Sequence, residues 1–251
     1  MKKLIFSVVL IPFLCLLTGC GRSLWIGNYY PQCVNIPLIE ERGDVRLEGS
    51  LLANKKLVCL GHISAAGGLT DNVATQFFFR NHYSWTDNQV SLGWYKTLGS
   101  GVFEIYGGYG NANGIRSSYN DDEPDIYYSK IGHTSQYFAQ INYGWNHLAN
   151  SHIAIAGAVK TGMLDSYMKY LHTGNDYQAG TEYPGTSRHY WGFFLEPYLS
   201  FCFGWDRLKF NIKAGYDLIC PKEMRDINTP RLMLDVGINY NFNILSGKKN
   251  K

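Results

Sequence analysis

Two short runs of the sequence carry a histidine and a serine two residues apart, a spacing that places both side chains on one face of a β-strand. The first pair is His62 and Ser64, and the second is His133 and Ser135. A serine hydroxyl becomes a nucleophile when a histidine accepts its proton and a third group orients that histidine. The sequence identifies no acid to place beside His62, and residues this common repeat such a spacing by chance, to which we attribute the second pair. We therefore predict that the chain is not an enzyme.

A run of carboxylates is the other group that could do chemistry, because carboxylate oxygens bind calcium. It consists of Asp121, Asp122, Glu123 and Asp125. Its spacing lacks the alternate ligands and the glycine of a calcium-binding EF-hand loop. We interpret the run as a hydrated loop, and we predict no metal and no cofactor.

The N-terminus has the layout of an export signal. Lys2 and Lys3 precede an apolar run of about 14 residues, too short for a membrane-spanning helix, and small residues then lead to Cys20. We predict a signal peptide over residues 1–19 in the form of a helix. An ordinary signal peptide cleaved at another small residue is the alternative.

Without the signal the basic and acidic residues are nearly balanced, although the whole chain has a formal charge of +3. This balance gives no electrostatic reason to expect nucleic-acid binding. With 45% hydrophobic and 15% aromatic residues, the chain is also unlike a disordered one. Export permits disulfides, and Cys33, Cys59, Cys202 and Cys220 leave three pairings open.

Apolar and polar residues alternate in segments of about ten residues, as in strands with one apolar face. The pattern predicts an all-β fold, an antiparallel up-and-down transmembrane β-barrel of about ten strands, with eight or twelve as alternatives. The barrel spans residues 44–243, between a periplasmic tether at 20–43 and a basic tail at 244–251. The expected strands are 44–53, 57–69, 73–83, 89–97, 102–110, 133–146, 152–163, 189–203, 208–217 and 231–243.

The connections between these segments favour a membrane barrel over a soluble lipocalin-like carrier. Short turns lie at one end, and the long stretches 111–132 and 164–188 lie at the other, as at the periplasmic and external ends of outer-membrane barrels. Aromatic residues gather near both strand ends, where membrane interfaces favour them. Those expected at the short-turn end are Trp94, Tyr95, Tyr143, Trp145, Phe203, Trp205, Tyr240 and Phe242, and those at the other end are Tyr83, Trp85, Tyr109, Tyr190, Trp191 and Tyr216.

If the apolar faces meet lipid, the opposite faces place charges of both signs in the lumen. The principal members of this predicted polar cluster are Arg80, Lys160, Glu196, Lys209, Lys213 and Asp235. Further polar residues expected inside are Arg46, Glu48, Gln76, His82, Gln136, Gln140, Asn142, Asn211 and Asn239. A narrow barrel is filled by such side chains, which pair into a plug. The alternative is a narrow polar pore for small solutes.

Tyrosines concentrate in the predicted external loops, where they could supply rigid contact area for a glycan or protein partner. The alternative is that their rings pack together and close the mouth of the barrel. The candidates for surface binding are Tyr119, Tyr127, Tyr128, Tyr170 and Tyr177.

Four stretches carry resemblances to known families. Leu17 to Cys20 resembles the lipobox of bacterial lipoproteins, which implies that Cys20 is acylated and anchors the chain to membrane lipid. Together with 35–44 and the turn at 68–74, it makes the chain similar to small lipid-tagged outer-membrane barrels of the Bacteroidota type. His62 and Ser64 resemble the His-x-Ser of lipid A deacylases, although they stand in the second strand rather than near the C-terminus. The resemblances imply an outer-membrane lipoprotein with a structural or surface-binding role, and a lipid-modifying enzyme is a lesser alternative.

Overall fold

Eleven β-strands make up almost all of the chain that the computed structural model describes, namely residues 34–53, 60–82, 85–119, 126–148, 152–174, 187–220 and 232–245. No helix occurs in these ranges, and so no helix in them could cross a membrane. The strands are β1 (Asp44–Ala53), β2 (Leu60–Gly68), β3 (Val73–His82), β4 (Trp85–Leu98), β5 (Gly101–Tyr119), β6 (Ile126–Leu148), β7 (Ile153–Gly174), β8 (Ser187–Gly204), β9 (Leu208–Tyr216), β10 (Leu218–Cys220) and β11 (Leu232–Asn243).

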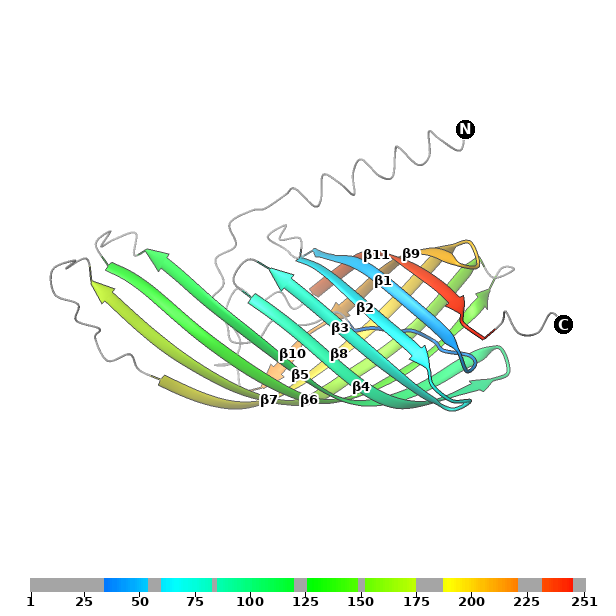
Figure 1. The fold of residues 1–251 in the computed structure, drawn as a ribbon, viewed down its shortest axis with the longest axis horizontal. Helices are drawn as coiled ribbons and strands as arrows, with labels where there is room; N and C mark the ends of the chain where they lie inside the picture. Colours follow the sequence, from blue (N-terminus) through cyan, green and yellow to red (C-terminus); the bar gives the residue numbers. More distant parts are fainter. Residues whose placement is uncertain are drawn as a thin grey trace, which may run out of the picture.

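The strands form one closed antiparallel barrel with ten positions in its wall (Figure 1). Each strand from β1 to β8 pairs with the next one along the chain, and β11 closes the ring by pairing with both β9 and β1. The short β10 follows β9 after the single residue Asp217 and also pairs with β8, so it continues the β9 position. Closure leaves no unpaired sheet edge, which is the condition for strands to cross a bilayer. The predicted antiparallel barrel of about ten strands is confirmed.

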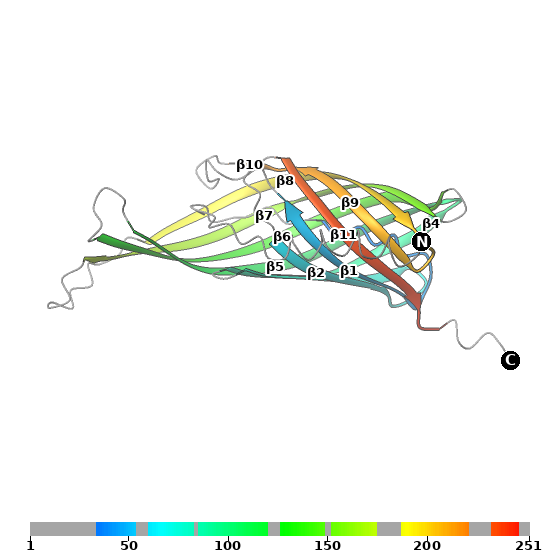
Figure 2. The same ribbon diagram turned by 90° about the horizontal axis from the view of Figure 1, so that it is seen from above.

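Strands β5, β6 and β7 extend well beyond the rest of the barrel at one end (Figures 1 and 2). The prediction that 111–132 and 164–188 are loops is wrong for most of their length, because β5 continues to Tyr119, β6 begins at Ile126 and β7 continues to Gly174. Outside a membrane both faces of a strand meet water, so the apolar alternation fades while the backbone pairing continues. Alternation therefore reports the part of a strand that crosses lipid, and it underestimates strand length.

The outer and inner faces of the wall differ sharply in polarity. Large apolar side chains point outward, with Leu199 69% and Phe193 62% exposed, whereas charged side chains such as Lys160, 1% exposed, point into the lumen. A soluble barrel has the reverse arrangement, with its apolar faces inside. The apolar outer face is the one expected for a barrel surrounded by lipid.

Aromatic rings form contacts on the outer face near both ends of the barrel. At the short-turn end, ring centroids lie 5.0 Å apart for Tyr143 and Trp145 and 5.7 Å apart for Tyr240 and Phe242. Two of the aromatic residues that were expected near the strand ends on the outer face lie elsewhere. Tyr95 is buried and donates a hydrogen bond to the carbonyl oxygen of Thr70 at 2.6 Å, and Tyr190 packs against an inner apolar cluster. Both residues lie at positions of their strands whose side chains face the lumen. Their closeness to a strand end therefore did not determine the direction in which they point.

Candidate functional site in the barrel lumen

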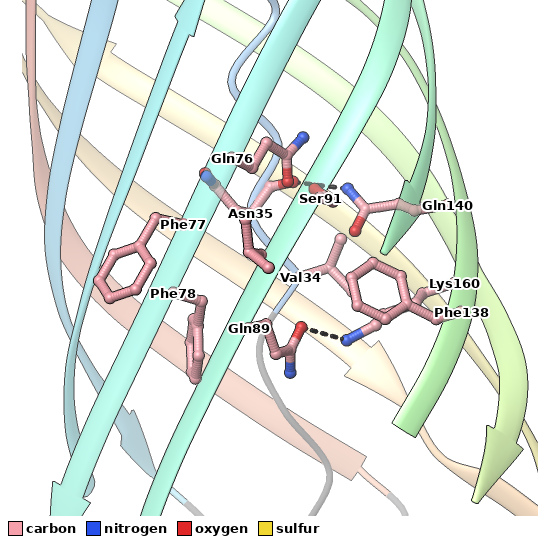
Figure 3. Close-up of a pocket in the computed structure, with 11 residues that line it drawn as sticks. Val34, Asn35, Gln76, Phe77, Phe78, Gln89, Ser91, Phe138, Gln140 and Lys160 are labelled. Carbon is pink, nitrogen blue, oxygen red and sulfur yellow. Dashed lines mark hydrogen bonds between the residues drawn. The ribbon is translucent and has the colours of Figure 1, made fainter. Parts of the chain in front are cut away.

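The lumen is occupied by the chain segment that precedes β1. Val34, Asn35, Ile36, Leu38 and Ile39 are all buried, and Val34 and Asn35 lie inside the ring of strands (Figure 3). The prediction that the whole of 20–43 is an extended tether outside the barrel is therefore wrong for residues 34–39. We call residues 34–39 the plug segment.

The plug segment is apolar at alternate residues, and these side chains form the main apolar cluster inside the barrel. Val34, Ile36 and Leu38 pack with residues from several strands, among them Leu52, Val102, Ala156, Ala158, Tyr198 and Met233. Burying these side chains removes apolar surface from water. The alternation of apolar residues from Val34 to Leu38 was a sign of burial that the sequence analysis missed.

Polar side chains of the wall bind the backbone of the plug segment. Arg46 donates hydrogen bonds to the carbonyl oxygens of Ile36, at 3.2 Å, and of Pro37. Glu104 accepts a hydrogen bond from the backbone amide of Ile39 at 2.7 Å. Further contacts come from Gln140, which donates to the carbonyl oxygen of Asn35 at 2.6 Å, and from Asn146, which donates to that of Leu38 at 2.7 Å. An extended chain without strand partners thus has its buried backbone groups satisfied by the wall.

The segment runs from the middle of the lumen toward the short-turn end. Asn35 lies against Gln140, in the middle of β6, whereas Leu38 lies against Asn146, near the end of that strand. Glu40 then reaches the rim, where its carboxylate lies 2.8 Å from the ring of His147. The plug segment therefore begins, at Val34, on the long-strand side of its other residues.

A cluster of charged groups lies in the lumen where β1, β2, β9 and β11 adjoin. Lys213 forms ion pairs with Glu48 and, at 3.7 Å, with Asp235. The ring Nε2 of His62 lies 4.0 Å from Glu48 and 3.6 Å from Asp235, and all four side chains are about 2% exposed or less. The carboxylates and the imidazole have the chemistry of a metal site, but the ammonium of Lys213 already supplies a cation to both carboxylates.

Arg80 and Lys160 have contacts of their own in the lumen, although Arg80 is the direct strand partner of His62. Arg80 pairs with Asp87 at 2.7 Å, and Lys160 donates a hydrogen bond to Gln89 at 2.7 Å. The ammonium of Lys160 also lies 4.2 Å from the centroid of the Phe138 ring, a cation–π contact. Lys160, Gln89 and Phe138, with Val34 and Gln76, line a small pocket between the plug segment and the wall (Figure 3).

Comparison with solved structures shows which barrels this arrangement resembles. The outer membrane protease OmpT from Escherichia coli superimposes with a TM-score of 0.54 over 80% of this chain and 94% of that one, at 5% identity. The chain has the fold of an outer-membrane β-barrel. Lower similarity is found to the translocator domain of the autotransporter NalP from Neisseria meningitidis (TM-score 0.45, 11% identity, 79% and 87% covered) and to the KdgM porin (0.37, 11%, 80% and 99%). No protein-family model matches the sequence, and no curated protein is similar to it.

Within this outer-membrane barrel, the six principal lumen residues predicted from sequence are all buried, but they do not form one cluster. Lys213 and Asp235 belong to the group around His62, Arg80 pairs with Asp87, and Lys160 lines the pocket. Lys209 lies nearer the short-turn end and donates to the carbonyl oxygen of Asn146 at 3.0 Å. Glu196 is the direct strand partner of Lys160. Alternation predicted the face on which these residues lie, but it carried no information about which neighbours they meet.

The remaining predicted sites are only partly within the described residues. Tyr119, Tyr127, Tyr128 and Tyr170 belong to the projecting strands rather than to loops, and no side-chain position is described for them. Tyr177, the acidic run 121–125, Tyr83, and the lipidation candidate Cys20 lie outside the described residues, as do Cys33 and Cys59. Cys202 is a free, buried thiol.

Proposed function

We propose that this protein is a lipid-anchored barrel of the outer membrane whose lumen is closed by its own N-terminal segment, and which acts through its outer surface. The observation that carries the proposal is the burial of residues 34–39 among polar groups of the wall. The apolar outer face supports integration into the membrane. The projecting strands β5, β6 and β7 supply a surface for a glycan or protein partner, as the tyrosines there suggest.

A closed lumen makes a direct electrical prediction. We expect the purified barrel in planar lipid bilayers to show no conductance above the lipid background, because side chains and the plug segment fill the lumen. Deleting residues 34–39 should open a polar path lined by Lys160, Gln89 and Gln140 and produce measurable single channels. Removal of residues 246–251 is the matched control and should leave the barrel closed. Steady channels in the intact protein would instead support the alternative of a narrow polar pore.

The lipid anchor predicts incorporation of fatty acid at one residue. Cells given radiolabelled palmitate should label the wild-type protein, and Cys20→Ser should lose the label while Cys33→Ser keeps it. A Cys20→Ser protein that is still labelled would contradict the assignment.

The direction of the plug segment extends this proposal to the position of the anchor. Because the plug segment begins at Val34, on the long-strand side of its other residues, and a stretch as long as residues 21–33 spans at most about 45 Å when extended, we expect Cys20 on the outer side of the membrane. An epitope inserted after Leu24 should bind antibody on intact cells, whereas the same epitope after Lys251 should bind only after permeabilisation. The reverse result would place the tether in the periplasm, as the sequence analysis expects.

A further inference from the structure

A hydrogen-bonded group of polar side chains lies on the outer surface of the barrel, outside the lumen. It consists of Asn113 on β5 and of His133 and Ser135 on β6, with Tyr109 of β5 beside them. His133 and Ser135 share a face because they are two residues apart. Asn113 is the direct strand partner of His133, so the three side chains are adjacent.

The contacts form a chain from serine to histidine to amide. The Oγ of Ser135 lies 3.2 Å from the Nε2 of His133, and the Nδ1 of His133 lies 2.6 Å from the Oδ1 of Asn113. An amide oxygen is an acceptor, so it holds the imidazole with its proton on Nδ1 and leaves the lone pair of Nε2 toward the serine. This is the arrangement of a nucleophile, a general base and an orienting group.

The third member is what the sequence analysis lacked. From the sequence, no acid can be placed beside His62, and the spacing of His133 and Ser135 is attributed to chance. Asn113 is an amide that strand pairing brings from 20 residues earlier in the chain. The pair that was considered first does not form such a site, because His62 and Ser64 are buried in the lumen and His62 lies against Glu48 and Asp235.

The position of the group on the barrel indicates its substrate. On the short-turn side of Ser135 the outer face of β6 is apolar and exposed, with Tyr137 54% and Ile141 45% exposed. Beside it, the rings of Tyr109 and Tyr137 lie 5.3 Å apart, and Trp191 is exposed on β8. At the level of Ser135 polar residues adjoin this apolar face, with Asp165 directly opposite Ser135 and in contact with His189. The serine thus faces outward where an apolar belt gives way to polar residues, at the depth of the ester bonds of membrane lipids.

We propose that Ser135 and His133, oriented by Asn113, form a site that hydrolyses the acyl esters of membrane lipids reached from the bilayer. This goes beyond the proposed function, since it assigns chemistry to the outer surface. The Oγ of Ser135 attacks the ester carbonyl carbon while the Nε2 of His133 accepts the hydroxyl proton. The carbon–oxygen bond to the glycerol or sugar alcohol breaks, and that alcohol leaves with the proton from His133. Water then attacks the acyl-serine with His133 as base, which releases the fatty acid and restores Ser135.

Tyr109 has a defined part in this reaction. Its hydroxyl lies 3.2 Å from the Oγ of Ser135, close enough to donate a hydrogen bond to the oxygen that becomes negative when the carbonyl is attacked.

The test uses the full-length barrel folded into vesicles of radiolabelled phosphatidylethanolamine and, in a second arm, mixed with purified lipopolysaccharide. We expect release of fatty acid in one arm, which identifies the lipid, and a loss of about a hundredfold or more in Ser135→Ala and in His133→Ala. Asn113→Ala should also lower the rate, whereas Asn113→Asp should retain it, because a carboxylate accepts the same hydrogen bond. His152→Asn changes an exposed histidine that contacts Gly204 at the short-turn end, and it should match the wild type.

A second measurement keeps the proposal falsifiable if turnover is slow. A fluorophosphonate probe, which phosphonylates an activated serine with loss of fluoride, should label the wild type at Ser135 and fail to label Ser135→Ala. The variants should keep the urea midpoint of the wild type, so that a folding defect is recognised. Absence of both probe labelling and fatty-acid release in the wild type, or unchanged release in Ser135→Ala, would overturn the proposal. Neither result bears on the conductance test of the closed lumen.

Discussion

Replacing Lys213 by methionine should lower the free energy of unfolding by about 3–5 kcal/mol, the cost of leaving a buried ion partner uncompensated. In the folded barrel the ammonium lies against both Glu48 and Asp235, and all three side chains are almost fully buried. Methionine fills a similar volume, so the loss reports the charge rather than a cavity. Urea titration of the purified barrel in micelles, followed by tryptophan fluorescence, measures the effect.

Two further variants separate this explanation from a general intolerance of the site. Lys213→Met combined with Glu48→Met should recover much of the loss, because one of the stranded carboxylates is removed. Lys96→Met changes a lysine that is exposed on β4 and should alter the free energy of unfolding by less than about 0.5 kcal/mol. Equal losses in Lys213→Met and Lys96→Met would mean that the luminal cluster contributes no more than a surface charge.

Replacing Gly162 by valine should destabilise the barrel by about 3 kcal/mol or more, the upper part of the range for overpacking. Gly162 is the strand partner of Phe138 on one side and of Phe194 on the other. A Cβ atom there would lie 2.0 Å from the carbonyl oxygen of Tyr137 and 2.9 Å from the Phe194 ring. A backbone carbonyl held in a sheet cannot move aside as a flexible side chain does, so the wall itself has to shift. The yield of folded protein and the urea midpoint both report the effect.

Gly107 offers a matched control on β5. A Cβ atom added there would meet nothing within 4 Å. Valine is favoured in strands, so Gly107→Val should be neutral or stabilising in the same titration. A Gly162→Val protein as stable as Gly107→Val would show that the Phe138 and Phe194 rings do not depend on the close approach of the backbone at Gly162.

The direction in which each side chain of the wall points was easier to predict than the contacts inside the lumen. The direction depends on the two environments of one strand, whereas the contacts depend on residues distant in the chain. Residues such as Leu234 and Asp235 must point to lipid and to lumen respectively, so the two-residue period appears directly in the sequence. The projecting part of β6 has water on both faces, and its strand was predicted to be a loop. Tyr95 and Tyr190 show the same limit, since an aromatic residue near a strand end fits a membrane interface and a luminal core equally well.

By itself the sequence determined the antiparallel barrel, the number of strands to a close approximation, and the face on which each luminal charge lies. The tertiary structure decided what depends on neighbours distant in the chain. It placed the plug segment in the lumen, gave the luminal cations different partners, and brought Asn113 to His133. The physical reason is that alternation is a property of one strand in its two environments, whereas a contact between side chains requires the register of two strands. That register follows from closure of the whole ring.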